Sequence, residues 1–558
     1  MKLKKVTLLL ALFWVSVLAF SQQPQFTEMQ LDSFAKAAYL KRMAAQDSAG
    51  TESARNAIRL AREEKAVSIT IHGYLKRELP DFTDASQVES FTCTKCTALD
   101  IPKLLKQLAQ LPKLKALSLN GCAIKVLPAE IETLKALETL TLKDNLFTTL
   151  PLTLSNLTAL RTLDVEHCGY LVDEYLWDAL KTSKVETLNF SASEVGEIHE
   201  KIGNLTSLKS LDLSINDVVA LPTAFSKLSS LETLKLSQNL RLDLVKLFAV
   251  LKSNANLKQL HINECLLQTV PLEVGELRHI KVLNLNGNQL KEIPLTIGSL
   301  AALEVLDLGG LPSGHRYNSI TVLPPTITDL KNLKVLNLFG NKLAELPDIA
   351  RLTALENLNV SLNQLNVFPA SVCALSNLKV LDLSQNNISV VPACIGKLTN
   401  MEQLLLNGNF FNTADKKIKT LPAEICLLQK LQLLSLKDNV IEQLPDCVGG
   451  FKALQVLDVR NNLLSTLPES VLQLNQLRKL LLKANELTSL PLQLNRLAGL
   501  KELDISFNPK LSFDLLLPAL QQMKQLEFMD VSYNKIDREK VVKLKLEMPS
   551  TKIARYEQ

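Results

Sequence analysis

The sequence predicts an α/β solenoid, in which short coils of chain stack in one direction and form a parallel β-sheet along one curved face. A repeated motif carries this prediction: residues 280–300 read IKVLNLNGNQLKEIPLTIGSL, and residues 378–398 read LKVLDLSQNNISVVPACIGKL. The composition agrees, because a chain that is 47% apolar but only 5% aromatic suits an aliphatic core between stacked coils. One extended solenoid therefore explains the 558 residues better than several globular domains.

Each repeat begins with a short strand. Counted from its first apolar residue, apolar side chains recur at offsets +3 and +5, so Leu283 and Leu285 are expected to point inward and Asn284 outward. Asn288, at offset +8, follows the strand. Its amide can satisfy backbone groups of neighbouring coils that would otherwise be buried without a partner. The repeated Asn therefore predicts a ladder of amides along the solenoid.

The return path of the typical repeat carries a proline. Pro294 fixes φ and removes a backbone donor, so the convex side is expected to be mostly irregular or 3-10 in conformation. Four copies lack the apolar-Pro pair and are longer. Their outer segments each predict one amphipathic helix: residues 97–111, 170–183, 240–253 and 510–523.

Eighteen clear copies follow one another, mostly 23 residues apart, as from 280 to 303. They start at Leu114, Leu137, Leu160, Val185, Leu208, Leu231, Leu257, Ile280, Leu303, Leu333, Leu355, Leu378, Met401, Leu431, Leu454, Leu477, Leu500 and Leu526. Two weaker coils precede them, one in residues 66–87 and one from Val88 onward, so about twenty repeats span residues 66–536.

The segments on either side of the repeats predict two caps and an export signal. Residues 22–65 contain two helical patterns and are expected to form a helical N-terminal cap, and residues 537–558 a C-terminal cap. Residues 1–21 have three lysines, an apolar run over 6–20 and small residues at Ala19 and Ser21, which predicts a secretory signal peptide. A retained N-terminal anchor is the alternative, but the run is short for a membrane span.

The charge balance bears on the class of partner. Removal of three lysines with the signal peptide lowers the formal charge from +5 to +2 (5 − 3 = 2). A nearly neutral protein gives no electrostatic reason to expect nucleic acid or an anionic membrane as the partner. No other run is long and apolar enough to cross a bilayer, so no integral membrane segment is expected after signal cleavage.

The outward residue between the two strand leucines is Asp in seven of the eighteen copies, among them Asp307 and Asp382. Carboxylates about 4.8 Å apart could bind a basic peptide or Ca²⁺. In the alternative, Asp and Asn in this column stabilise the sheet by hydrogen-bonding sideways. Few aromatic residues share this side: Phe339, Phe507, Phe528 and Tyr533. Because binding hot spots favour aromatic residues and Arg, a strong patch is expected at the C-terminal end or on inserted loops.

Two copies contain insertions. The copies that start at Leu303 and Met401 are 30 residues long (333 − 303 and 431 − 401), so each has seven extra residues. The insertions, in 309–320 and 407–418, are expected between the ladder position and the next inward residue, on the same edge of the solenoid. They predict a two-loop recognition edge, made of His315, Arg316, Tyr317, Phe410, Phe411, Lys416 and Lys417. The alternative is a pair of variable loops without function.

The chain has nine cysteines. In an exported protein they suggest disulfide bonds, although an odd number leaves at least one cysteine unpaired. Four share the ladder position, where a small buried thiol can replace Asn: Cys96, Cys122, Cys168 and Cys265. Cys93 and Cys96 form a CxxC motif, but Cys93 is an inward strand residue and no second CxxC exists. No metal and no cofactor are therefore expected.

Two further cysteine pairs follow a common register. Cys373 and Cys426 each lie four residues after a proline, whereas Cys394 and Cys447 lie two after the proline of the next coil. These positions flank the inward residue on opposite sides, so each pair can meet across adjacent coils. The register predicts the disulfides Cys373–Cys394 and Cys426–Cys447.

Catalytic motifs are missing from the sequence. The six His do not cluster, and there is no HExxH, no GxSxG and no phosphate-binding glycine loop. Catalysis needs a nucleophile, a base or a metal set within hydrogen-bond reach. The sequence therefore predicts no catalytic residues and a protein that is not an enzyme.

The repeats resemble leucine-rich repeat proteins of the LxxLxLxxNxLxxLPxxI type, and are similar to bacterial exported members and to the Ras-related scaffold group of plants and animals. The resemblance covers about residues 66–536. It implies a right-handed solenoid, horseshoe or superhelical, with the parallel sheet on its concave face. It also implies binding of a protein or peptide on that face or on the loop edge, without naming the partner.

Together with the export signal, the resemblance predicts an exported recognition module that is periplasmic, cell-surface or secreted. Two other functions stay open. One is a structural or adhesive component of the cell envelope. The other is an intracellular signalling scaffold, if residues 1–21 are not a signal peptide.

Overall fold

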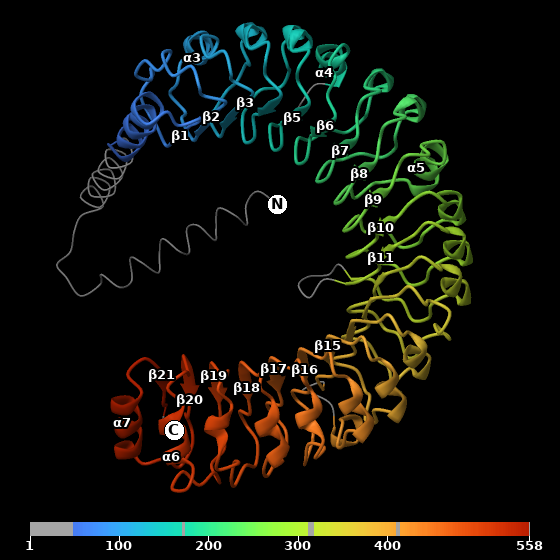
Figure 1. The fold of residues 1–558 in the computed structure, drawn as a ribbon. Coiled ribbons are helices and arrows are strands. Elements are labelled where there is room, and N and C mark those ends of the chain that lie inside the picture. The colour runs from blue at the N-terminus through green and yellow to red at the C-terminus, as the bar shows by residue number, and fades with distance from the viewer. Residues whose placement is uncertain (1–47, 170–172, 311–316, 409–412, 557–558) are drawn as a thin grey trace, which may run out of the picture. The chain divides into compact units, whose positions relative to one another are not determined.

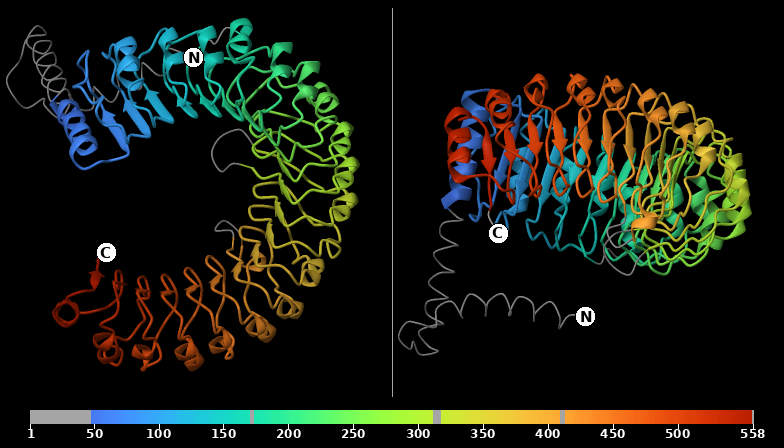
Figure 2. Two further views of the ribbon diagram at one scale, coloured as in Figure 1. Left: turned by 45° about the horizontal axis from the view of Figure 1, so that its top comes forward. Right: turned by 90° about the horizontal axis from the view of Figure 1, so that it is seen from below.

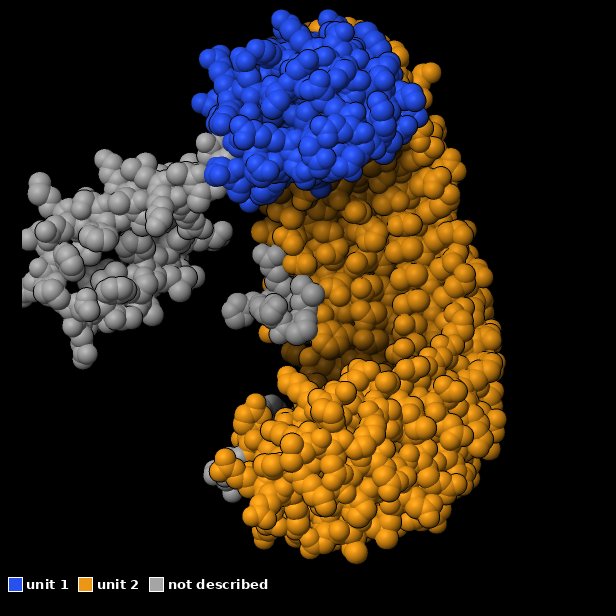
Figure 3. All heavy atoms as spheres, turned by 60° about the vertical axis from the view of Figure 1, so that its left-hand side comes forward, with its two compact units in different colours: residues 1–146 blue, residues 147–558 orange. Residues whose placement is uncertain are grey.

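The computed structural model describes residues 48–169, 173–310, 317–408 and 413–556. They belong to two compact units, Met1–Leu146 and Phe147–Gln558 (Figure 3). Within each unit, neighbouring coils contribute short strands that pair in parallel. No helix of the described residues is long and apolar enough to span a membrane.

The first unit contains a helix, over residues 48–63, and four coils. The helix buries Ala54, Ile58 and Ala61. The strands are β1 (Ser68–His72), β2 (Ser90–Thr94), β3 (Ala116–Asn120) and β4 (Thr139–Thr141). The convex side carries α3 (Ile101–Leu108), which Asp100 caps by accepting a hydrogen bond from the Lys103 N–H, and η1 (Ala129–Thr133).

The second unit continues the same pattern, and Figures 1 and 2 show its sheet along the inner side of an arc of coils. Its strands are β5 (Thr162–Asp164), β6 (Thr187–Asn189), β7 (Ser210–Asp212), β8 (Thr233–Lys235), β9 (Gln259–His261), β10 (Val282–Asn284), β11 (Val305–Asp307), β12 (Val335–Asn337), β13 (Asn357–Asn359), β14 (Val380–Asp382), β15 (Gln403–Leu405), β16 (Leu433–Ser435), β17 (Val456–Asp458), β18 (Lys479–Leu481), β19 (Glu502–Asp504), β20 (Phe528–Asp530) and β21 (Lys552–Ala554). The middle residue of these strands is buried, which confirms the predicted inward leucines.

The convex side confirms the prediction from the prolines. Most coils return through a 3-10 turn. In nine of the described turns of the second unit a proline comes directly before: η2 (Leu152–Asn156), η4 (Thr223–Lys227), η5 (Leu272–Glu276), η6 (Leu295–Ser299), η7 (Pro325–Asp329), η8 (Ala370–Ala374), η9 (Ala393–Lys397), η11 (Ala423–Leu427) and η13 (Glu469–Gln473). A different residue precedes η3 (Glu200–Asn204), η12 (Val448–Gly450) and η14 (Leu494–Arg496). Helices occur in the longer coils that lack the apolar-Pro pair, as α3 shows and as predicted for three later coils: α4 (Asp173–Leu180), α5 (Leu244–Leu251) and α6 (Leu517–Gln522). The coil of η3 lacks the pair too, but has the ordinary length and keeps a 3-10 turn. The chain ends with the charged helix α7 (Arg538–Glu547) before β21.

The Asn ladder is present and connects adjacent coils. Asn288 is fully buried. Its Nδ2 donates to the carbonyls of Ile262, at 3.0 Å, and Leu285, at 2.8 Å. Its Oδ1 accepts from the N–H groups of Cys265, at 2.8 Å, and Leu267, at 3.2 Å. One amide therefore satisfies backbone groups in its own coil and in the preceding one, as the sequence predicted.

The first insertion lies on the other side of the ladder position from the one predicted. Asn318 takes the ladder role in the coil that starts at Leu303: its Nδ2 donates to the carbonyl of Leu308 at 2.9 Å, and its Oδ1 accepts from the N–H of Leu290 at 3.1 Å. The prediction was wrong because it counted offset +8 through the insertion. Asn318 lies two residues before the inward Ile320, the spacing that every intact repeat has between ladder Asn and next apolar residue.

A second ladder, made of charges, lies just before the strands. The residues at offset +1 in successive coils are Glu186, Lys209, Glu232, Lys258, Lys281, Glu304, Lys334, Glu356, Lys379 and Glu402. Glu304 accepts from Lys281 at 2.7 Å and from Lys334 at 2.8 Å, and these two ammonium groups lower the pKa of Glu304 to about 2. The groups are exposed, so salt screens the pairs and each stabilises the fold only slightly.

Candidate functional site

The strand face of the second unit is the outer surface of its β-sheet. It carries the strand side chains that point away from the core. Outward residues within and directly after each strand form columns that run from coil to coil, because the strands pair in register. Past the strand ends lies the edge from which both insertions leave, after Gly310 and Gly408. We call it the loop edge. Asp307, Phe339 and Asp382, three of the candidate binding residues, lie on the strand face.

The carboxylate column is used by the fold itself. Asp307 accepts a hydrogen bond from the Gly309 N–H at 3.0 Å, and Asp382 accepts one from the Ser384 N–H at 2.9 Å. In both cases the donor is the N–H group two residues after the Asp. It points away from the neighbouring strand and would otherwise need a water molecule as its partner. Asp307 also accepts sideways from Asn337 Nδ2 at 2.8 Å. These contacts support the alternative in which the Asp column stabilises the sheet. The main hydrogen bond of each carboxylate lies within its own coil, and the sideways bond to the next coil is additional.

The predicted two-loop edge is described only in part. His315, Arg316, Phe410 and Phe411 lie outside the described residues. Tyr317 is exposed, Lys416 ends the short turn η10 (Ala414–Lys416) and is exposed, and Lys417 follows it half-buried. Phe339, half-buried, lies on the strand face. No hydrogen bond, ion pair or ring contact joins these residues to one another within the described parts of the chain, so the two-loop edge stays a prediction.

The structure contains three disulfides among the described residues. Cys373 bonds to Cys394 and Cys426 to Cys447, with Cα atoms 5.7 and 6.0 Å apart. We call these two the convex disulfides, because they join neighbouring 3-10 turns. Cys93 bonds to Cys96 in addition.

The Cys93–Cys96 bond was not predicted, because Cys93 was expected to be an inward strand residue and Cys96 a ladder thiol. The ladder thiols of Cys122 and Cys265 instead donate to carbonyls of the preceding coil, at 3.4 and 3.3 Å. These contacts agree with the predicted exchange of Asn for a small thiol.

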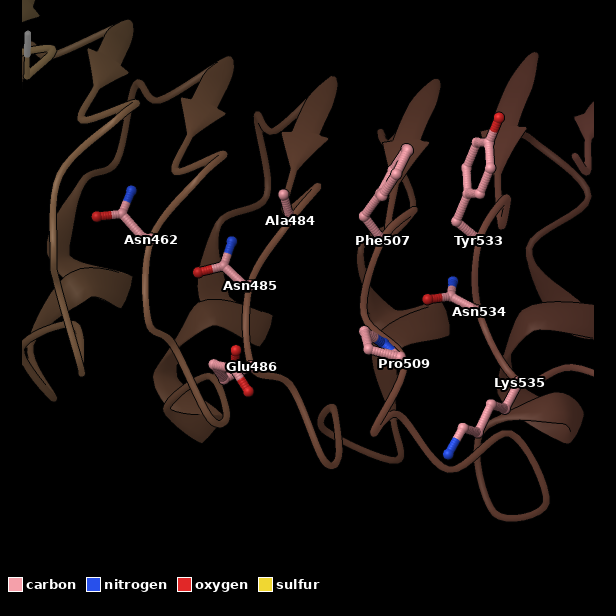
Figure 4. A pocket seen from close by; sticks show the side chains of 9 residues that line it. All are labelled: Asn462, Ala484, Asn485, Glu486, Phe507, Pro509, Tyr533, Asn534 and Lys535. Atoms are coloured by element: carbon pink, nitrogen blue, oxygen red, sulfur yellow. The ribbon is translucent and has the colours of Figure 1, made fainter. Parts of the chain in front are cut away.

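A hollow of about 510 Å³ lies on the loop edge near the C-terminal end, just past β17, β18, β19 and β20. We call it the aromatic hollow. Figure 4 shows the side chains that line it: Asn462, Ala484, Asn485, Glu486, Phe507, Pro509, Tyr533, Asn534 and Lys535.

Two stacked rings form one wall of the aromatic hollow. The ring centroids of Phe507 and Tyr533 are 4.1 Å apart and the planes are inclined by 25°. Lys483 Nζ lies 4.9 Å from the centroid of Phe507, at cation–π distance. Phe507 nevertheless stays 37% exposed. Both rings occupy offset +7, where φ is positive, +56° for Phe507 and +58° for Tyr533, a conformation that favours Gly or Asn.

The charges around the hollow are unequal. Glu486 pairs with Lys510 at 2.6 Å, whereas Lys483 and Lys535 add two more ammonium groups. On the neighbouring strand face, burial raises the pKa of Asp504, and the nearby Asp530 carboxylate adds to this increase. Hydrogen bonds from Ser506 oppose it.

Both rings of this wall were predicted to face outward, but the hollow beside them was not predicted. The signal was available: at offset +7, Ala484 precedes two consecutive coils with aromatic residues. The described residues contain no group of three or more side chains suited to hold a metal ion. The geometry brings aromatic rings, lysines and polar columns together on one surface.

The coils belong to the class of repeat solenoids with a parallel sheet along one face, and family models specify the repeat. "Leucine-rich repeat region" matches residues 411–548, "Leucine rich repeat" matches 112–169 and 353–411, and "Leucine Rich Repeat" matches 279–300. With the coil architecture these matches support a leucine-rich repeat protein, and the fold is a leucine-rich repeat solenoid. No curated protein matches the chain.

Solved structures share this fold. A leucine-rich repeat protein of Leptospira interrogans is 26% identical, with a TM-score of 0.58 and coverage of 82% of this chain and 98% of that one. A chain of the Toll–Spatzle complex of Drosophila is 18% identical, with a TM-score of 0.61 and coverage of 88% and 62%. A chain of the TLR13–ssRNA13 complex is 23% identical, with a TM-score of 0.57 and coverage of 87% and 66%. The last two likenesses concern the fold alone.

Proposed function

We propose that this protein is an exported recognition module that binds a protein or peptide partner on the strand face or the loop edge of its solenoid. One observation carries the proposal: Phe507 and Tyr533 form a stacked, partly exposed aromatic pair at a backbone position where neither ring serves the core. Exposed rings held in a strained conformation are typical of binding surfaces. The partner meets this surface without chemical change, since the site offers no set of catalytic groups.

Two solved structures that share this fold are complexes with a bound molecule, which is the precedent for the proposal. One is a complex of Toll with Spatzle, and the other is a complex of TLR13 with ssRNA13. Binding of RNA needs many cationic contacts to phosphate. The present chain carries 62 Lys and Arg against 57 Asp and Glu. This near balance favours a protein or peptide over nucleic acid.

The disulfides support export. Disulfides persist in oxidising compartments and are rare in the cytosol, so three of them within the described residues favour a periplasmic, cell-surface or secreted location over the intracellular scaffold. We further propose the layout predicted above, with a signal peptide at 1–21, caps at 22–65 and 537–558, and the solenoid at 66–536. Cell fractionation with N-terminal sequencing tests it: export and a mature N-terminus near residue 22 are expected, and a cytosolic protein with residues 1–21 intact contradicts it.

Pull-down from envelope and secreted fractions tests recognition. The test variant lacks residues 311–317 and 410–416, seven from each insertion. This deletion retains Asn318 and Asn409 at offset +8, so the ladder register is kept. Full-length protein is expected to capture a partner that crosslinks to the strand face or the loop edge.

The deletion variant separates the two parts of the surface. Loss of capture at an unchanged melting temperature places the contact on the insertions, and retained capture places it on the rest of the surface. Absence of any captured partner contradicts recognition and favours the structural envelope role.

A further inference from the structure

We propose that the aromatic hollow is the anchor of this recognition surface, and that it takes an aromatic side chain from an acidic peptide segment of the partner. The inference rests on the proposed function and names the chemistry that the partner must present. It follows from the shape of the hollow, from the rings at its wall and from the charges around it.

The shape follows from one small residue in a row of larger ones. Offset +7 is occupied in four consecutive coils by Asn461, Ala484, Phe507 and Tyr533, with φ of +54°, +54°, +56° and +58°. Because the backbone conformation is the same, these side chains leave the chain in the same direction. The space over Ala484 is therefore the place where a third ring of the row would lie. Its volume, about 510 Å³, falls in the range of about 300–1,000 Å³ that is usual for ligand sites.

The wall is preorganised to receive a ring. Tyr533 fixes the orientation of Phe507 by stacking at 4.1 Å, so a ligand does not have to order that side chain. Pro509 contributes a rigid apolar surface beside it. An incoming ring that contacts Phe507 gains the attraction of an aromatic pair together with burial of apolar surface.

The charges favour an acidic partner. Lys535 lines the hollow, is exposed and forms no ion pair with any described residue, and Lys483 lies beside the Phe507 ring. Glu486, the carboxylate of the lining, is already paired with Lys510. Lys483 also interacts with the Asp504 carboxylate of the neighbouring strand face, which leaves Lys535 as the uncompensated charge of the lining. A segment with Asp or Glu next to its aromatic residue complements Lys535, whereas a basic segment would bring a like charge to it.

The polar lining favours a peptide over a saccharide, although sugars also stack on aromatic rings. The amides at the base are committed to the backbone: Asn485 Nδ2 donates to the carbonyl of Val459 at 3.0 Å, and its Oδ1 accepts from the N–H of Leu464 at 3.0 Å. Asn462 makes the same kind of contacts. These amides are therefore not available to sugar hydroxyl groups, which need such partners.

The test is selection of random short peptides displayed on phage against purified full-length protein. The enriched peptides are expected to share an aromatic residue next to Asp or Glu. Ala484→Tyr fills the hollow with a side chain that the same register already carries at Tyr533, so the fold should tolerate it. This variant is expected to bind the enriched peptides at least about tenfold more weakly.

Gln385→Tyr is the matched control. Gln385 has the same register and φ of +55°, but lies in the coil of β14, away from the hollow. It is expected to bind the enriched peptides as the unmodified protein does, and thermal unfolding should be alike for both variants. A shared loss of binding in the two variants would overturn the anchor.

Several other results would overturn the anchor: no enrichment, enriched peptides that lack aromatic residues or are basic, or equal binding by Ala484→Tyr. Binding to a glycan array is the test of the peptide assignment. If a saccharide binds the unmodified protein and Ala484→Tyr blocks that binding, the peptide assignment is overturned. Capture of a partner from cell fractions that Ala484→Tyr leaves intact would overturn the anchor alone, and recognition elsewhere on the surface would stand.

Discussion

Replacement of Asn288 by Ala measures what holds adjacent coils together. The side chain is fully buried, and its loss leaves the N–H groups of Cys265 and Leu267 without an acceptor. It also leaves the carbonyl of Ile262 without its Asn288 donor. The carbonyl of Leu285, the fourth partner of Asn288, still accepts a hydrogen bond from Asn318 in the next coil. Each buried group left unsatisfied costs about 1–3 kcal/mol, so three groups near the lower end cost about 4 kcal/mol.

Hydrogen exchange is the suitable assay, because a long repeat array opens locally and has no single free energy of unfolding. Asn288→Ser is the matched variant, since Ser193 holds the ladder position naturally and its Oγ donates to the carbonyl of Val165 at 2.9 Å. Opening of the coils that contain β9 and β10 should be eased by about 4 kcal/mol in the Ala variant and by clearly less in the Ser variant. Unchanged protection, or equal losses in both variants, would refute the reasoning.

Three further predictions concern charge and disulfides. Glu304→Gln should lower the melting temperature slightly at pH 7 and low salt, because the pKa of Glu304, about 2 when folded, lies below its ordinary 4.5. The difference should shrink as pH falls from 4.5 towards 2 and in high salt, and its persistence at pH 2 would contradict the ion pairs. Asp504→Asn should raise the melting temperature at pH 7, because burial raises the pKa of Asp504 above 3.8 and the folded state disfavours the carboxylate. Asn at this position can still accept the backbone hydrogen bond, as Asn284 does. The gain in melting temperature should vanish as pH falls below 3.8, because Asp504 is then protonated in both the folded and the unfolded state. A lower melting temperature of the variant at pH 7 would contradict this prediction. Peptide mapping without reductant should recover both convex disulfides, and alkylation of all four cysteines would disprove them.

The sequence was sufficient for the fold because each coil repeats the same local rule. Leucines at offsets +3 and +5 must be inward, Asn must satisfy buried backbone groups, and Pro cannot continue a ladder. The four convex helices were predictable for the complementary reason, since those coils lack the apolar-Pro pair and are longer than the typical repeat. The misplaced first insertion shows the limit of this counting. Asn318 was visible two residues before Ile320, but only hydrogen bonds show that it, rather than the residue at +8, has the ladder role.

The candidate site was less accessible from the sequence. Phe507 and Tyr533 were recognisable as outward aromatic residues, but the hollow depends on the alignment of offset +7 between coils and on the small side chain of Ala484. The bond between Cys93 and Cys96 was missed for a similar reason, because one residue was assigned to the core and the other to the ladder. Spacing identifies which residues repeat, whereas contacts between non-repeating side chains need coordinates.

Hydroxyl-radical footprinting of the protein with a captured partner tests the central claim most directly. Recognition along the sheet predicts protection of outward side chains on the strand face and the loop edge of the second unit, with Phe507 and Tyr533 among them. The 3-10 turns of the convex side should react as they do in the absence of the partner. Protection confined to those turns, with both rings as reactive as before, would contradict the account.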